Sequence, residues 1–193
     1  MTLACITLLT LLLSGFSVVD PVYPPNAAGG GTVVAVVKVA GGQVKDVTVL
    51  WGEEPFVASC KDALARWSFS AEADINHIVV VYFRKPELLS AASWRQKISA
   101  AKAVTLLPYP RYVFAPSYPP NALAQGSVVI RVEISEEGRV VDQQVIKPMG
   151  ILTEASKEAV AKWEFYPARD HKGRKIASHA YVVLVFRFPV IVE

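Results

Sequence analysis

Apolar and polar residues alternate most clearly in one seven-residue stretch of the chain. In VVIRVEI (128–134) every second residue is apolar, and Arg131 and Glu133 lie between apolar neighbours. A period of two predicts a strand with one face in a core. Gly138 then suits a turn that needs a positive φ, and Arg139–Lys147 is predicted to be the returning strand. The pattern therefore predicts a β-hairpin.

A helical pattern follows this hairpin. In Thr153–Trp163 the apolar residues fall on one side at helical spacing, and the charged residues fall elsewhere. A polar, turn-like segment around Gly173 comes next, and Ala180–Phe188 is an almost unbroken apolar run. The unit is therefore strand–strand–helix–strand. We expect a three-stranded antiparallel sheet with one helix packed on one face.

The chain contains this unit twice. The phrase YPPNA occurs at Tyr23–Ala27 and again 95 residues later at Tyr118–Ala122, and WSF (67–69) matches WEF (163–165). The elements predicted for the first copy are Val33–Val39, Val44–Leu50, Phe56–Trp67 and Ile78–Arg84. The predicted fold class is thus α+β, with two tandem small domains at residues 18–86 and 117–193.

The first copy differs in its first strand, which is apolar on both faces because Val34 and Val36 stand where the second copy has Val129 and Arg131. A sheet with two apolar faces needs a second cover, which the second copy or the linker could provide. The linker, residues 87–116, is predicted to be partly helical, because Leu88–Val104 is rich in Ala and lacks Gly and Pro. Three prolines, at 108, 110 and 116, then favour an extended entry into the second copy.

The N-terminal segment Leu3–Val19 is apolar and carries no charge. We interpret residues 1–17 as a cleaved secretory signal, with a mature start near Val18. An uncleaved membrane anchor is the alternative, since the run lies at the short edge of what spans a bilayer. Cleavage would remove Cys5 and leave Cys60, which is predicted to be a buried packing residue on the first helix.

Composition and charge exclude several classes of protein. Hydrophobic residues make up 52% of the chain and charged residues 19%, which excludes a disordered chain. The net charge of +3 is spread along the sequence, too diffuse to indicate nucleic-acid binding. We expect a protein partner and no cofactor.

Candidate catalytic groups are few. His171 and His179 flank the polar hairpin of the second copy and could meet across it, but a metal site would need further ligands. No serine lies in a nucleophile-elbow setting, and the glycines at 29–31 lead into a strand, unlike a phosphate-binding loop. The sequence therefore predicts no catalytic, cofactor or metal site, and we expect no enzymatic activity.

The second copy carries a pattern of spaced residues together with the alternating strand, the helix and the last apolar strand. These residues are Tyr118, Pro119, Ala122, Gly126, Gly138, Trp163, Phe165, Pro167 and Gly173. As an ensemble the pattern resembles the C-terminal domain of TonB, the periplasmic energy transducer of Gram-negative bacteria. The first copy keeps Tyr23-Pro24, Gly31, Gly42 and Trp67-x-Phe69 but has Ala71 where the proline would fall, so it resembles a degenerate copy.

The resemblance implies a two-layer fold and a binding role. In the family, the last strand offers a free edge to a short segment of an outer-membrane receptor, which pairs with it as an added strand. Carried over to this chain, the partner-binding strand consists of Tyr181, Val182, Val183, Leu184, Val185 and Phe186. An edge strand presents unpaired backbone N–H and C=O groups. The same apolar run also fits a strand that is buried by both the helix and the other copy, and this alternative stays open.

The resemblance further implies export to the periplasm and a role in envelope transport, with a TonB-dependent outer-membrane receptor as the partner. A family transducer has an inner-membrane helix and then a long Pro-rich stretch, whereas here the first copy begins within a few residues of the apolar segment. We therefore expect a periplasmic binding module. The alternative is a short transducer, anchored in the inner membrane and facing the periplasm; a homodimer is also open.

Overall fold

The computed structural model describes residues 16–27, 29–69, 75–84, 95–99, 106–120, 122 and 124–188. The predicted signal segment, residues 1–17, lies outside this part of the chain except for Phe16 and Ser17. None of the helices formed by the described residues has the length and apolar character needed to cross a membrane.

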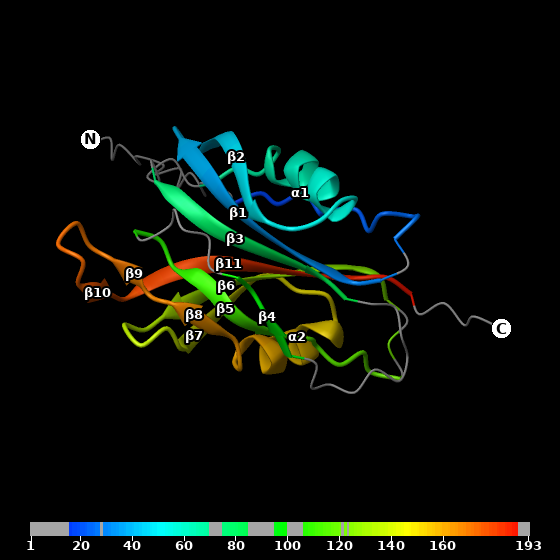
Figure 1. The fold of residues 1–193 in the computed structure, drawn as a ribbon. Helices are drawn as coiled ribbons and strands as arrows, with labels where there is room; N and C mark the ends of the chain where they lie inside the picture. Colours follow the sequence, from blue (N-terminus) through cyan, green and yellow to red (C-terminus); the bar gives the residue numbers. More distant parts are fainter. Residues whose placement is uncertain are drawn as a thin grey trace, which may run out of the picture.

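Six strands form the main sheet, in the order β2-β1-β3-β11-β6-β7 (Figure 1). Their bounds are β1 Gly31–Ala40, β2 Gln43–Trp51, β3 Asn76–Phe83, β6 Gly126–Ile134, β7 Val140–Lys147 and β11 Ser178–Phe186. Pairing is antiparallel within each half, but β3 and β11 are parallel neighbours at the centre. The sequence predicted two separate small domains. In the structure the two three-stranded units instead share one mixed sheet.

Two helices, α1 (Phe56–Leu64) and α2 (Leu152–Val160), cover opposite faces of this sheet (Figure 1). Two units whose last strands run parallel and side by side are related by a half-turn about an axis along those strands. Such a rotation turns one unit's faces over, so its helix arrives on the other side. Each half then needs cover on the face that its own helix leaves bare.

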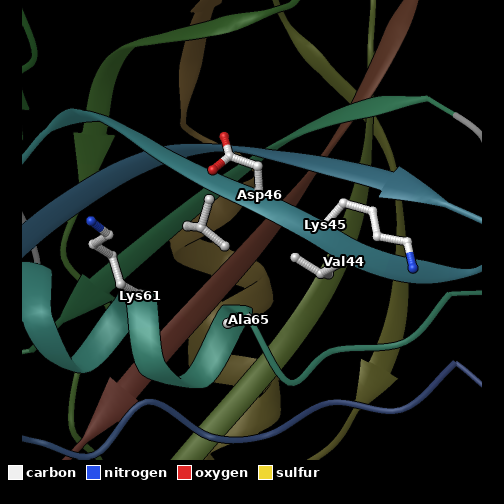
Figure 2. A pocket seen from close by; sticks show the side chains of 6 residues that line it. Val44, Lys45, Asp46, Lys61 and Ala65 are labelled. Atoms are coloured by element: carbon white, nitrogen blue, oxygen red, sulfur yellow. The ribbon is translucent and has the colours of Figure 1, made fainter.

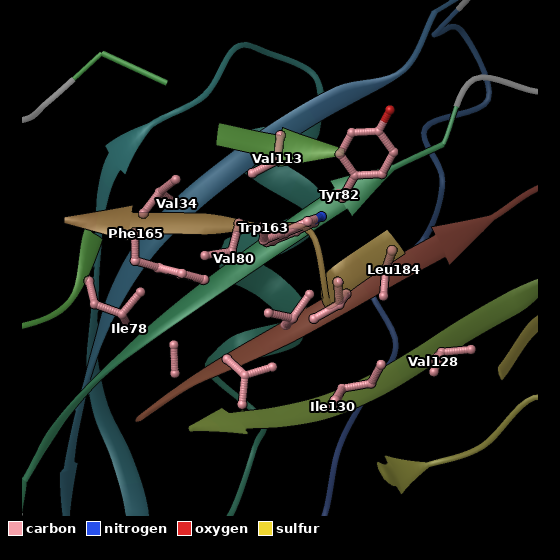
Figure 3. Close-up of a cluster of buried hydrophobic side chains, with 14 of the residues drawn as sticks. Val34, Ile78, Val80, Tyr82, Val113, Val128, Ile130, Trp163, Phe165 and Leu184 are labelled. Carbon is pink, nitrogen blue, oxygen red and sulfur yellow. The ribbon is translucent and has the colours of Figure 1, made fainter. Parts of the chain in front are cut away.

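Side chains of the central strands point alternately into two buried clusters. The α1-side core includes Cys60, Leu64, Trp67, Val79, Val81, Phe83, Tyr181, Val183 and Val185. The α2-side core includes Val34, Ile78, Val80, Tyr82, Trp163, Phe165, Val182, Leu184 and Phe186 (Figure 3). Because both faces of β11 are buried, the alternation of polar and apolar residues is lost there. Cys60 is a buried packing residue, as predicted, and burial raises the pKa of its thiol.

The linker supplies the second cover for the first half. Strands β4 (Arg95–Lys97) and β5 (Tyr109–Phe114) pair with β8 (Glu164–Tyr166) in a three-stranded sheet. Val113 of this small sheet packs in the α2-side core with Val34 and Ile78 (Figure 3). The helix predicted over Leu88–Val104 is wrong at Arg95–Lys97, which is a strand, and most of its remainder lies outside the described residues.

The segments that precede the two halves make equivalent contacts. The indole Nε1 of Trp67 donates to the carbonyl of Val19 at 2.9 Å, and that of Trp163 donates to the carbonyl of Phe114 at 3.0 Å. The Phe16 ring extends the first segment's cover onto the second half, stacking on Tyr181 with a centroid distance of 5.2 Å. A cut after Ser17, as the sequence predicts, would remove this ring.

The largest difference between the halves is a hairpin that projects from the second. It consists of β9 (Ala168–Arg169) and β10 (Lys175–Ile176), joined by an exposed turn that includes Gly173. Figure 1 shows this hairpin extending away from the main sheet. The first half has residues 70–74 at the corresponding place, outside the described part of the chain.

Candidate partner-binding strand

The strand predicted to bind a partner lies at the centre of the sheet. On one side β11 pairs with β6 from Ser178 to Phe186, antiparallel. On the other side it pairs with β3 from Tyr181 to Val185, parallel. We call this second pairing the β3–β11 seam. The prediction that Tyr181–Phe186 is a free edge is therefore wrong for this structure, in which the last strand of the first half lies along it.

The burial of this strand follows from its two neighbours and two covers. Val182, Val183 and Leu184 are fully buried, and the side chains of Tyr181, Val185 and Phe186 are nearly so. Burial by the helix layer together with the other half is the alternative that the apolar run left open. The backbone of this strand is already paired with β6 and β3, and its side chains lie in the two cores.

Two histidines lie just beyond the paired residues at one end of the seam. His77 Nδ1 on β3 and His179 Nε2 on β11 lie 3.2 Å apart. Burial first, and then the charges of His179 and Arg131, lower the pKa of His77 to about 4, and burial also lowers the pKa of His179. Both rings are therefore neutral near pH 7, and one donates a hydrogen bond to the other.

This pair differs from the one that the sequence suggested. His171 lies in the exposed turn of the β9–β10 hairpin, and His179 pairs with His77 instead. The ring of His77 also stacks on Phe69, with centroids 4.7 Å apart. Within the described ranges, no three His, Cys, Asp or Glu side chains come together as a metal site. The sequence missed the role of His77 because only the parallel register of the two halves reveals its neighbour.

The opposite end of the seam is held by a buried arginine. Arg84 is 3% exposed, its backbone N–H donates to the carbonyl of Val185 at 2.9 Å, and its Nε donates to the carbonyl of Pro116 at 3.0 Å. Its guanidinium also lies over the ring of Tyr118, 5.2 Å from the centroid. A cation from the first half thus contacts the start of the second half, which helps to keep β3 in place.

The motif residues of the second half have structural roles. The Tyr118 hydroxyl donates to the carbonyl of Ala124 at 2.9 Å, and the N–H of Ala122 donates to the carbonyl of Pro119, also at 2.9 Å. Gly138 has a φ of +82°, and a Cβ atom there would lie 1.9 Å from the backbone oxygen of Phe165. These contacts fix the entry into β6 and the hairpin turn.

The remaining motif positions fill the core or form turns. Trp163 and Phe165 are buried in the α2-side core, Pro167 lies between β8 and β9, and Gly173 has a φ of +78° in the hairpin turn. The first strand of the second half begins at Gly126, whose φ is +141°. The motif residues therefore maintain the fold of this half, and Gly173 is the one among them that is exposed.

The ends of the main sheet are β2 and β7, which the sequence did not single out. Each carries two register shifts against its neighbour, so neither offers a long regular ladder. Two contacts tie β7 to other elements: Gln143 Nε2 with the carbonyl of Lys157 at 3.2 Å, and Lys147 with Asp20. Arg139, directly before β7, adds an ion pair with Glu164 at 2.9 Å. Such contacts and bulges are how proteins protect sheet edges from unwanted pairing.

Comparison with known proteins identifies the second half. Residues 115–188 match the family described as the Gram-negative bacterial TonB protein C-terminal. This part of the chain is thus similar to a TonB C-terminal domain. No second copy is detected in the first half, and a search of curated proteins found no match to the chain.

The family gives the second half a general role. The TonB C-terminal domain is a non-catalytic module, and such domains bind TonB-dependent outer-membrane receptors. The domain therefore implies a TonB-like role in energy transduction or receptor interaction in the context of envelope transport, at the periplasmic face. In this chain, however, the last strand of the TonB domain already has a partner on both sides.

Proposed function

We propose that this protein is a non-enzymatic periplasmic binding module whose TonB-type strand is covered by its own first half. The first half is a degenerate copy of the TonB domain, and its last strand, β3, occupies the place of an incoming segment. A segment of an outer-membrane receptor binds Tyr181–Phe186 by strand addition after β3 moves away. The observation that carries this proposal is the parallel pairing of β3 with β11.

Of the two neighbours of β11, β3 is the one suited to exchange. Its register covers Tyr181–Val185, whereas that of β6 covers the full length of β11. Parallel pairing is also slightly less stable per residue than antiparallel pairing. Displacing β3 keeps the antiparallel sheet of the TonB domain intact. The exposed backbone groups of β11 can then pair with the incoming receptor segment.

The incoming segment must replace the side chains that β3 provides. Val79 and Val81 contact the α1-side core, and Val80 and Tyr82 contact the α2-side core. The incoming segment must therefore bury apolar side chains on both faces of the sheet. This requirement favours a segment rich in apolar residues, because an unpartnered polar side chain in either core would be strongly unfavourable.

A disulfide across the seam tests the proposal. Val80 lies opposite Val182 in the β3–β11 register, and both are fully buried. Neighbouring strands lie within disulfide range, so the double variant Val80→Cys, Val182→Cys can be locked by oxidation. The Cys60→Ser background removes the buried native thiol, and Cys5→Ser is added so that the N-terminal segment contributes none. Ser156 holds the position equivalent to Cys60 in the second half. The matched control is Val34→Cys, Val80→Cys, which locks β1 to β3 within the first half.

Binding of synthetic peptides from the periplasm-facing plug segments of TonB-dependent receptors is measured with each variant, oxidised and reduced. We expect the seam lock to abolish binding and reduction to restore it, while the control lock leaves binding unchanged. Equal binding to the oxidised and reduced seam variant would show that β11 is not the site. Absence of binding in every state would overturn the receptor-binding function.

A further inference from the structure

A shallow groove lies between α1 and β2 in the first half. It has a volume of about 260 Å³ and is lined by Val44, Lys45, Asp46, Val47, Lys61 and Ala65. Figure 2 shows Val44 beside the helix, with Lys61 on α1 and Ala65 directly after α1 on the side of the strand. We call this the α1–β2 groove. It lies next to β2, which pairs along its length with β1. On its other side the described residues form only an isolated bridge, between Gln43 and Ser68 at the start of the strand.

A hydrogen bond bridges the equivalent place in the second half. There Gln143 of β7 reaches across to α2, and its Nε2 donates to the carbonyl of Lys157 at 3.2 Å. By the repeat alignment Gln143 corresponds to Val47, and Lys157 corresponds to Lys61. Valine has no group that can reach the helix backbone. The same architecture therefore has a bridge in one half and an open groove in the other.

The lining of the groove combines an apolar floor with two cations. Val44 and Val47 pack at the margin of the α1-side core and supply apolar surface. The ammonium groups of Lys45 and Lys61 have no carboxylate partner among the described residues. The carboxylate of Asp46 already accepts a hydrogen bond from the Thr48 hydroxyl at 2.7 Å. With two lysines and one aspartate in the lining, the groove has a net charge of +1.

We propose that the α1–β2 groove is a second docking site, for an extended segment of a partner protein that carries an apolar and an acidic residue two positions apart, on the same face of the strand. The segment adds to the free side of β2, so that backbone hydrogen bonds hold it. An apolar side chain covers Val44 and Val47, and a carboxylate meets Lys61. This site is separate from the β3–β11 seam, and it does not require the seam to open.

The register of β2 limits the length of the segment. Lys38 pairs with Asp46 and Ala35 pairs with Val49, and register shifts lie on either side of this run. Only Asp46–Val49 therefore offers regular backbone next to the groove. A short segment fits this place, and a long flat strand from a second sheet does not, which favours a peptide over edge-to-edge pairing of two copies.

The decisive variants exchange one residue between equivalent positions of the two halves. Val47→Gln places in the groove the residue that closes the second half, and Gln143→Val is the matched control. Lys61→Gln removes one of the two unpaired cations. The probes are two blocked, fluorescein-labelled octapeptides in which every second residue is threonine. The positions between the threonines are valine and aspartate in turn in one peptide, and valine and lysine in turn in the other. Affinity is measured by fluorescence anisotropy at low salt, and circular dichroism checks that each variant is folded.

We expect the acidic peptide to bind the unaltered protein at least fivefold more tightly than the basic one. Val47→Gln and Lys61→Gln each weaken this binding fivefold or more, and Gln143→Val leaves it unchanged. In the seam-locked protein the binding is the same, which separates this site from the one on β11. Equal binding of both peptides, unchanged binding to folded Val47→Gln, or a dimer that involves β2 in sedimentation would each overturn the proposal.

Discussion

The two halves of the molecule share a topology and differ at their surfaces. In both, a tryptophan indole bonds to the carbonyl of the preceding segment, and a tyrosine hydroxyl bonds to a carbonyl six residues ahead. Only the second half matches the TonB family, and it alone has the β9–β10 hairpin and the Gln143 bridge among the described residues. The interior contacts define the fold, and the edges are where the halves have diverged.

The largest expected effect tests whether the two halves unfold together. Trp67 and Trp163 are each 1% exposed and occupy equivalent places in the two cores. Replacing either with alanine should destabilise the protein by about 3–5 kcal/mol, because it leaves a cavity in a close-packed core. Urea unfolding followed by circular dichroism and by tyrosine fluorescence provides the measurement.

Because the halves share one sheet, each variant should still unfold in a single transition with coincident probes. Two separated transitions, with Trp67→Ala moving only one of them, would show that the halves are independent domains.

The histidine pair gives the seam a pH dependence. The pKa of His77 is lowered from 6.5 to about 4 in the folded protein, so between these values the unfolded chain binds more protons. Stability should therefore fall as the pH drops from about 6.5 towards 4, by up to about 3 kcal/mol at 1.36 kcal/mol per pKa unit. Protonated His77 would face His179 and Tyr181 on β11 and Arg131 on β6, with Glu133 of β6 the nearby opposite charge.

Urea titrations of the native protein and of His77→Gln between pH 7 and pH 4.5 measure this effect. The loss on acidification should be clearly smaller in His77→Gln, whereas His171→Gln, in the exposed hairpin turn, should behave like the native protein. An identical pH slope for native protein and His77→Gln would contradict the assignment.

A glycine comparison separates backbone strain from steric contact. Gly138 and Gly173 have similar φ values of +82° and +78°, but only a Cβ at Gly138 would meet the backbone of Phe165. Gly173→Ala should cost about 1 kcal/mol for the left-handed conformation alone. Gly138→Ala should cost roughly 2 kcal/mol or more, because the Phe165 carbonyl must also move. Thermal unfolding measures both, and equal losses would argue against the close approach.

The smallest expected effect concerns the protected edge. The Arg139–Glu164 pair ties β7, with side chains that are 63% and 22% exposed. Arg139→Gln should destabilise the protein by about 0.5 kcal/mol, since exposed ion pairs contribute little. Arg66→Gln, which breaks the Asp62 pair on α1 of the first half, is the control and should have a similar effect. A loss above about 2 kcal/mol would mean that the β7 edge depends on this pair far more than its exposure indicates.

The periodicity of the sequence predicted the six main strands and both helices. Apolar and polar residues alternate in Val128–Ile134 because β6 has polar neighbours on part of one face. The observed strand begins two residues before this range, at Gly126. Observed helix α2 ends at Val160, before the predicted end at Trp163. The double apolar face of the first strand correctly predicted a second cover, which is the linker sheet around Val113.

What the sequence could not give is the arrangement of one strand beside another. An unbroken apolar run such as Ala180–Phe188 indicates burial on both faces, but it does not tell whether a strand or a partner lies alongside. The position of β11 depends on long-range pairing with β3, and so does the contact of His77 with His179. Arg95–Lys97 is a strand despite its helical composition, because β5 offers it a ladder and tertiary pairing overrides weak local preference.

Because β3 and β11 belong to one chain, a partner segment needs a threshold affinity to displace β3. A strand that belongs to the same chain behaves as though it were present at roughly millimolar local concentration, whatever the amount of protein. A free peptide that recognises Tyr181–Phe186 must outcompete this resident strand, so its measured affinity will be weaker than its intrinsic one. Receptors that hold their own segment close to the domain meet the threshold more easily than dissolved peptides do.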